Sequence, residues 1–215
     1  RRLIDFAAGI GIKGIAIYGF LRDSHGGVEA AKKVASYGAS KDVAIMPGIG
    51  ATWYGGCYYE GDHPYNLETF LRKFPGARLV KGERERQDRE NIEGVCPTHP
   101  LFREWIQEGT QWLFKTFEIG GVNIENGDFV VCHDPGCKAH KTSWPEDDPD
   151  IFRLQFLSYE PVLKSIPDLL RDKLVAVVTY TGFVPGARKD DEPRYMTPYM
   201  YCERPKMVDC LPNEG

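Results

Sequence analysis

The sequence lacks the features that mark several large classes of protein. No apolar run approaches the roughly 20 residues needed to span a bilayer, and no segment has the pattern of a signal peptide. Basic residues are not in excess, because 27 Lys and Arg stand against 31 Asp and Glu, which gives a net charge of −4. No basic stripe, internal repeat or low-complexity segment is present. Neither a nucleic acid nor a membrane span is therefore expected as a partner.

Cysteines are few for a disulfide-built protein, with six in 215 residues. A chain of this length can bury a sizeable core without covalent staples, so a disulfide scaffold is not implied. The length suggests one domain or a large part of one. The chain begins Arg-Arg and ends Asn-Glu-Gly, as an internal piece of a longer protein would. Its ends do not define a compartment or an oligomeric state, and a secreted or periplasmic location is favoured.

Short apolar runs alternate with segments of helical periodicity along the chain. Continuous apolar runs are typical of parallel strands that are covered on both faces. Such runs lie at 14–18, 43–46, 122–125 and 174–178. Apolar residues at helical spacing predict helices near 3–7, 26–37, 66–74, 98–117 and 151–170. Pro47-Gly48 is expected to close the second strand, and Pro161 and Pro167 to kink or split the last helix.

This order of elements predicts a mostly parallel sheet, either an open doubly wound sheet or a barrel. The first strand leads into Tyr18-Gly19-Phe20-Leu21, which is not the G-x-G-x-x-G fingerprint of a dinucleotide fold. Long aromatic and acidic loops follow the strands, where barrel enzymes keep their chemistry. We therefore expect an α/β fold of the (β/α)8 TIM-barrel type. Four strands cannot close such a barrel, so 1–215 is expected to be an incomplete part of one catalytic domain.

Glu125 and Asp128 are the leading candidates for catalytic groups. Glu125 stands at the carboxyl end of a predicted buried strand, and Asp128 follows shortly after it. Glycosidic cleavage needs one carboxylic acid that protonates the leaving oxygen and a second group that stabilises or attacks the anomeric carbon. A carboxyl at the rim of an apolar barrel can have the raised pKa that an acid catalyst requires. The structural alternative is a salt bridge for Glu125 and a turn cap for Asp128; the loop context favours catalysis.

The loop at 52–65 is the second candidate site, as a carbohydrate-binding surface. Its aromatic rings offer flat apolar faces with polar edges, and sugars stack on such faces. For any single ring, packing of the loop on the barrel rim is the better interpretation, whereas the cluster as a whole favours a ligand. Together with polar residues at the strand ends, the expected substrate contacts are Trp53, Tyr54, Tyr58, Asp62, His63, Asn123, Asn126 and Tyr180.

The segment Cys132-His-Asp-Pro-Gly-Cys-Lys-Ala-His140 is the third candidate, for a metal or a disulfide. Its C-x4-C-x2-H spacing offers three soft ligands, with His133 beside them. A structural zinc needs four ligands, and no other Cys/His pair is in register. Two free thiols are the first interpretation, and a local disulfide or a metal are the alternatives. Cys96, before the longest predicted helix, is expected to pack in the core, and no metal or cofactor is predicted.

Two stretches of the sequence resemble a known group of enzymes. The passages Val95-Cys-Pro-Thr-His-Pro-Leu-Phe-Arg-Glu-Trp105 and Ile119-Gly-Gly-Val-Asn-Ile-Glu-Asn-Gly-Asp128 resemble (β/α)8-barrel glycoside hydrolases. The stretch Gly127-Asp-Phe-Val-Val-Cys-His-Asp-Pro-Gly-Cys-Lys-Ala139 is similar to the Asp…Cys-x-Cys-x-x-Cys-Lys-Ala stretch of barrels related to β-hexosaminidases and α-glucuronidases. Asp134 here occupies the position of the middle Cys.

The resemblance implies a strand assignment and a catalytic residue. It makes 14–18 an early strand, 43–46 the next, 121–125 about the fourth and 174–180 the fifth. The fourth strand of such barrels commonly carries the general acid, which here maps onto Glu125, while Asp128 could orient a substrate group. The nucleophile usually lies on a later strand, beyond this segment, so the segment alone is expected to be inactive.

Our hypothesis from the sequence is a glycoside hydrolase that cleaves O-glycosidic bonds of an oligo- or polysaccharide. Two other classes stay open. A non-catalytic carbohydrate-binding barrel would keep the aromatic loop without needing Glu125. A metal-dependent barrel hydrolase would use His63, His133 and His140 with nearby acids, although the H-x-H pair usual in such enzymes is missing.

Overall fold

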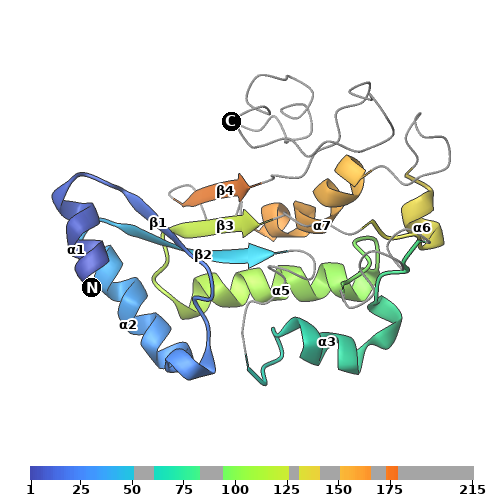
Figure 1. Ribbon diagram of the computed structural model, residues 1–215, viewed down its shortest axis with the longest axis horizontal. Helices are drawn as coiled ribbons and strands as arrows, with labels where there is room; N and C mark the ends of the chain where they lie inside the picture. Colours follow the sequence, from blue (N-terminus) through green and yellow to red (C-terminus); the bar gives the residue numbers. More distant parts are fainter. Residues whose placement is uncertain (51–60, 83–93, 126–130, 141–150, 166–172, 179–215) are drawn as a thin grey trace, which may run out of the picture.

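The computed structural model describes residues 1–50, 61–82, 94–125, 131–140, 151–165 and 173–178. These residues form a mixed α/β fold with a single parallel sheet (Figure 1). The strands are β1 (Gly14–Ile17), β2 (Ala44–Gly50), β3 (Gly121–Glu125) and β4 (Leu174–Val178). The helices are α1 (Arg2–Gly9), α2 (Gly27–Ala39), α3 (Leu67–Lys73), α5 (Pro100–Thr116), α6 (Pro135–Lys138) and α7 (Ile151–Ser165), with 3-10 turns η1 (Asp23–His25) and η2 (Pro75–Ala77).

The order of elements agrees with the sequence prediction. The four strands are neighbours in the order β1-β2-β3-β4, and every pairing is parallel. Helices occupy the predicted connections, and the predicted cap of α3 is present, because the Asn66 side chain accepts a hydrogen bond of 2.9 Å from the backbone N of Thr69. Since β2 pairs directly with β3, strand 121–125 lies two strands from 14–18 in this sheet.

The second strand runs further than expected. Pro47-Gly48 was predicted to close it, but β2 continues to Gly50. Pro47 is the last β2 residue in register with β1, opposite Ile17, and from Gly48 onward β2 pairs with β3. A proline is tolerated at the end of a ladder, where its missing N–H leaves little unpaired. The strand therefore passes through the proline and carries its end to the level of Glu125.

The last helix is continuous through a proline, because Pro161 lies inside α7 and the split that was one of the two expected outcomes does not occur. A proline at this position has no N–H to donate to the carbonyl of Leu157, four residues earlier. Nη1 of Arg103 on α5 donates to that carbonyl instead, at 2.9 Å. A side chain from another helix thus supplies the hydrogen bond that the proline cannot give. Pro167, the other predicted break, lies outside the described residues.

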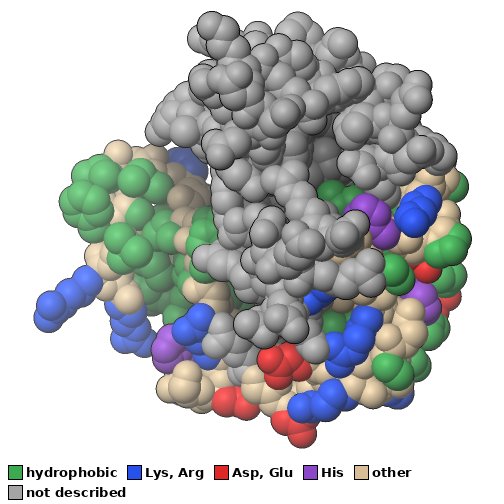
Figure 2. All heavy atoms as spheres, turned by 45° about the vertical axis from the view of Figure 1, so that its right-hand side comes forward, with side chains coloured by type: hydrophobic (Ala, Val, Ile, Leu, Met, Phe, Trp, Pro, Cys, Tyr) green, Lys and Arg blue, Asp and Glu red, His purple; other side chains and the backbone are tan. Residues whose placement is uncertain are grey.

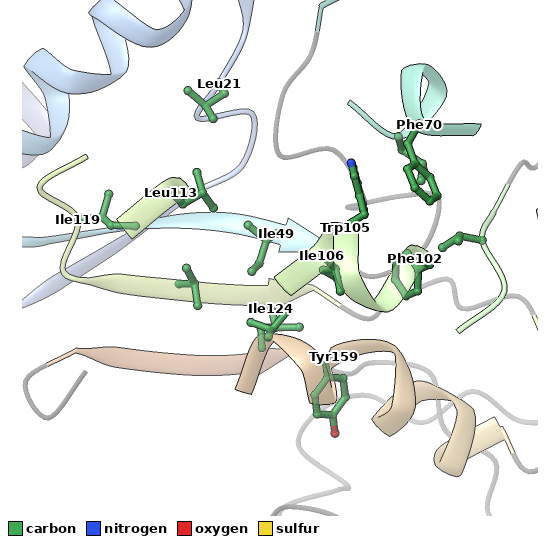
Figure 3. Packing of buried hydrophobic residues seen from close by; sticks show 14 of the residues in the cluster. Leu21, Ile49, Phe70, Phe102, Trp105, Ile106, Leu113, Ile119, Ile124 and Tyr159 are labelled. Atoms are coloured by element: carbon green, nitrogen blue, oxygen red, sulfur yellow. The ribbon is translucent and has the colours of Figure 1, made fainter. Parts of the chain in front are cut away.

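The two faces of the sheet differ in chemistry. One face carries large aliphatic side chains such as Ile49, Val122 and Ile124, each at most 1% exposed, which pack with residues of α5 (Figure 3). The other face carries small or polar residues at matching register positions, Gly48 on β2 and Asn123 on β3. The aliphatic face packs against α5 as the outer face of a (β/α)-barrel strand packs against its helices.

One surface of the described fold is apolar. Leu3, Phe6 and Ile10 follow each other at helical spacing on and after α1 and are 58–64% exposed. Figure 2 shows apolar side chains gathered at the left-hand end of the molecule, the end at which α1 lies in Figure 1. Within the described part of the chain, no helix has the length and hydropathy to cross a membrane.

Candidate active site at the carboxyl edge of the sheet

The carboxyl ends of the strands define the candidate site. Because all pairings are parallel, these ends meet at one edge of the sheet, where α/β proteins place ligands. Glu125 is the last residue of β3 and is in register with Gly50 on β2 and Val178 on β4. The backbone of Glu125 is thus held between two neighbours at the end of a central strand, as the sequence predicted.

A polar contact crosses the sheet just below this edge. Nδ2 of Asn123 on β3 donates to the hydroxyl oxygen of Tyr18, which follows β1, at 2.7 Å. The Tyr18 ring passes over Gly48 on the strand between them, and a Cβ at Gly48 would lie 2.7 Å from Cδ1 of that ring. A glycine at 48 therefore makes the contact possible. Asn123 is only 4% exposed whereas Tyr18 is 55% exposed, so the hydrogen bond links a buried amide to a solvent-exposed ring.

The predicted site residues divide into three sets. Asn123 and Glu125 lie on β3, two residues apart. Asp62 and His63 lie before α3. The structure does not describe the remaining ones, which are Trp53, Tyr54, Tyr58, Asn126, Asp128 and Tyr180. Tyr18 was not among the predicted contacts, although its place at the end of the first strand marked it as a rim residue.

Asp62 and His63 have different surroundings. Asp62 is exposed, and its carboxylate lies 3.6 Å from Nη2 of Arg72. The His63 ring packs 4.9 Å from the ring of Trp112 on α5, between ring centroids, and its Nδ1 accepts a 3.1 Å hydrogen bond from the backbone N of Tyr65. Burial lowers the pKa of His63, against a smaller opposing effect of Asp23.

The segment that carries these two residues is anchored to α5. Nε1 of Trp105 donates to the backbone oxygen of Pro64 at 2.7 Å, and the ring of Tyr65 lies 5.1 Å from that of Trp112. Packing of the rings on the barrel was the alternative to ligand contact. His63 and Tyr65 do pack on α5 in this way.

The cysteines gather in a way that the sequence did not indicate. Cys96, Cys132 and Cys137 are all buried free thiols, and their sulfur atoms lie within 4.8 Å of one another. Free thiols at Cys132 and Cys137 were expected, but Cys96 was expected only to pack. It precedes Cys137 by 41 positions, so spacing alone carried no signal for the pair. Hydrogen bonds from Cys132 and Cys137 lower the pKa of Cys96 well below its ordinary range.

Histidines and acids do not form a comparable group. Among residues 1–50, 61–82, 94–125, 131–140, 151–165 and 173–178, the three cysteines are the one cluster of metal-ligating side chains. Within that part of the chain, His63, His133 and His140 are not gathered, so nothing there supports the metal-dependent hydrolase with histidine ligands.

Comparison with known proteins shows the fold. No family profile and no curated protein sequence matches the chain. Among solved structures, the GH36 α-galactosidase AgaA from Geobacillus stearothermophilus superposes with a TM-score of 0.54 at 12% identity, covering 83% of this chain and 25% of that one. The α-L-fucosidase isoenzyme 2 from Paenibacillus thiaminolyticus gives a TM-score of 0.51 at 12% identity, covering 84% and 29%. The fold is a partial (β/α)-barrel.

This chain corresponds to only part of each of these solved structures. The chain spans 25% of the α-galactosidase, 29% of the fucosidase and 38% of an α-amylase from Geobacillus thermoleovorans. At this identity the likeness concerns the barrel fold that glycoside hydrolases use, and function has to be argued from the site.

Proposed function

We propose that this chain is part of a glycoside hydrolase that cleaves O-glycosidic bonds of an oligo- or polysaccharide, with Glu125 as the acid/base. The observation that carries the proposal is the place of Glu125 as the last residue of β3, between Gly50 and Val178, at the carboxyl edge of a parallel sheet. Barrel enzymes take catalytic groups from such strand ends. The fold likeness to an α-galactosidase and an α-L-fucosidase supports the same class.

The neighbours of Glu125 in the sheet suit a sugar. Alternate residues of a strand share a face, so Asn123 belongs to the face opposite the aliphatic residues Val122 and Ile124. The amide of Asn123 and the hydroxyl of Tyr18 are joined by their 2.7 Å hydrogen bond on that face. Amide and phenol groups both donate and accept hydrogen bonds, as recognition of sugar hydroxyls requires.

The other expected contacts complete the proposal. Asp128 would orient a substrate group near Glu125, and aromatic rings of the loop after β2 would stack on sugar units. The proposed substrate contacts are Trp53, Tyr54, Tyr58, Asp62, His63, Asn123, Asn126 and Tyr180.

The test is hydrolysis by the full-length protein of a panel of aryl glycosides and polysaccharides, with Glu125→Gln beside wild type. Removal of a catalytic carboxylate should lower kcat by about 10²–10⁴-fold, the typical contribution of general acid–base catalysis. Glu118→Gln is the matched control, because Glu118 is an exposed carboxylate that precedes β3 at the opposite end of the strand. It should keep wild-type activity.

Other outcomes would contradict the proposal in distinguishable ways. Equal activity of Glu125→Gln and wild type would make Glu125 structural. Binding of glycans without cleavage by either protein would favour the non-catalytic carbohydrate-binding barrel.

A further inference from the structure

Four chain segments meet at a small cluster beside the main core. Cys96 precedes α5, while Cys132 and Cys137 flank the start of α6. Their side chains pack with Leu79, Leu154 and Leu157, and together these six residues form a buried cluster separate from the large one under the sheet. Half of the residues in this cluster are thus cysteines. A cluster so small and so rich in sulfur calls for an explanation beyond packing.

The distances between the sulfur atoms fit a metal ion. Sγ of Cys96 lies 3.6 Å from Sγ of Cys137, and all three sulfurs lie within 4.8 Å of one another. Four sulfurs at about 2.3 Å from a tetrahedral zinc are separated by about 3.8 Å. A disulfide would need about 2.05 Å between two sulfurs, and it would leave the third cysteine without a role. The three sulfur atoms are therefore arranged around a common point, and no two of them are bonded as a disulfide. We call these three sulfurs the cage.

Hydrogen-bond donors surround the cage. The backbone N of Val80 donates to Sγ of Cys132 at 3.3 Å. The hydroxyl of Thr98 lies 3.2 Å from Sγ of Cys96 and 3.3 Å from Sγ of Cys137. Such donors stabilise the negative charge of metal-bound thiolates and fix their orientation. The same hydroxyl could also bond to a water that completes a tetrahedron, since the described residues supply three ligands.

We propose that Cys96, Cys132 and Cys137 bind one zinc ion as thiolate ligands. Three thiolates are a soft donor set, which favours zinc over the hard cations magnesium and calcium. Burial of all three sulfurs would shield the bound ion from bulk solvent. Each thiol loses its proton on binding, and the zinc ion takes the three sulfur lone pairs without any change of oxidation state.

The ion would cross-link the segment before α5, which carries Cys96, to the segment around α6, which carries Cys132 and Cys137. Residues 78–80 already contact both segments, because Arg78 pairs with Val95 and the oxygen of Val80 accepts a hydrogen bond of 2.7 Å from the backbone N of His133. Cys132 follows Glu125 by seven positions in the sequence, so the ion would hold the chain close after the candidate acid/base.

The first test is metal analysis of the full-length protein, purified with a reductant and without chelator. We expect about one zinc per chain in wild type, and less than a tenth of that in Cys96→Ser, Cys132→Ser and Cys137→Ser. Leu157→Ala is the matched control, since it opens the same cluster without removing a sulfur, and it should retain the zinc. Because zinc could also reach the protein after purification, cobalt(II) added to metal-free protein should give the intense sulfur-to-cobalt absorption of thiolate ligation.

A second measurement covers variants that fail to fold. Chelation of the wild-type protein should lower its melting temperature, and added zinc, but not magnesium, should restore it. Metal-free wild type with three free thiols and no cobalt–thiolate absorption would overturn the proposal, and so would a disulfide between any two of these cysteines detected by mass. Retention of zinc by all three serine variants would do the same. None of these outcomes bears on Glu125, so the two proposals fail independently.

Discussion

The side-chain amide of Asn123 donates a 2.7 Å hydrogen bond to the hydroxyl of Tyr18, across the strand that lies between them. The bond joins a nearly buried group on β3 to a half-exposed ring after β1, at the edge where Glu125 ends its strand. It thus ties the position of the Tyr18 ring, at the edge of the candidate site, to strand β3.

The energy of this bond can be measured by a double-mutant cycle. Tyr18→Phe and Asn123→Ala should each lower the free energy of unfolding, and their coupling should be about 1 kcal/mol, the net value of a typical hydrogen bond. Denaturant unfolding of the two single variants and the double variant gives the number. Strictly additive effects would mean that the bond contributes nothing.

Gly48 should tolerate no side chain without a change at Tyr18. A Cβ at position 48 would lie 2.7 Å from Cδ1 of the Tyr18 ring, so Gly48→Ala must displace the ring and break its bond to Asn123. We expect the free energy of unfolding of Gly48→Ala to be about 1–3 kcal/mol lower than that of wild type, the usual cost of overpacking. In Gly76→Ala the new Cβ would meet no atom within 4 Å, so this matched control should unfold like wild type. Equal stability of both variants would contradict the prediction.

Arg103 should matter because of Pro161. Its guanidinium supplies the donor that the proline cannot give to the carbonyl of Leu157. Arg103→Met should therefore cost about 1–3 kcal/mol, the penalty for an unsatisfied buried acceptor. In a Pro161→Ala background the alanine N–H can serve that carbonyl, so the same substitution should cost less. Thermal or denaturant unfolding of all four proteins decides the matter, and an equal cost in both backgrounds would refute this account.

Glu160 should contribute a part of the free energy of unfolding that is lost at low pH. Burial tends to raise the pKa of Glu160, but hydrogen bonds and charges from Arg103 and Lys164 outweigh it and hold the pKa below the ordinary value. Because the folded pKa is below the unfolded one, the contribution is fully present above the unfolded pKa and is lost as pH falls through the folded pKa. Glu160→Gln should cost about 1 kcal/mol at pH 7.

The pH series supplies the check on Glu160. The difference between wild type and Glu160→Gln should shrink as both proteins are unfolded at successively lower pH. Glu118→Gln, at an exposed position, should follow wild type throughout. A difference that is the same at neutral and acid pH would show that the ion pair is not its source.

Trp105 should hold the segment that carries Asp62 and His63. Its Nε1 donates to the oxygen of Pro64, so Trp105→Phe removes the donor and keeps an aromatic ring in the core. We expect the free energy of unfolding to fall by about 1–3 kcal/mol. Relative to wild type, amide exchange should accelerate more at residues 61–66 than in α5. Unchanged exchange in that segment would place its anchor elsewhere.

Local chemistry explains why most elements could be predicted from the sequence. Continuous apolar runs bounded by turn residues favour strands of a parallel sheet, and Asn66 before an apolar period caps a helix through its own side chain. The edge position of Glu125 follows from strand direction alone, because parallel strands end together. These properties depend on residues close together in the chain.

The departures from prediction arise from contacts between distant residues. The sequence of α7 alone predicts a break at Pro161, because proline cannot donate to the carbonyl of Leu157. Arg103, on another helix, donates to that carbonyl instead. Pro47 signals a strand end, and only the change of pairing partner from β1 to β3 allows β2 to continue.

The sequence by itself determined the elements, because periodicity is a local property. The alternation of strands and helices then determined the parallel arrangement and the rim position of Glu125, because strands joined through helices run parallel. Tertiary structure alone decided that Tyr18 meets Asn123 over Gly48, and that Cys96 joins Cys132 and Cys137. The physical reason is that a side-chain cluster depends on how elements far apart in the chain pack. No spacing along the chain records a 3.6 Å approach between residues 41 positions apart.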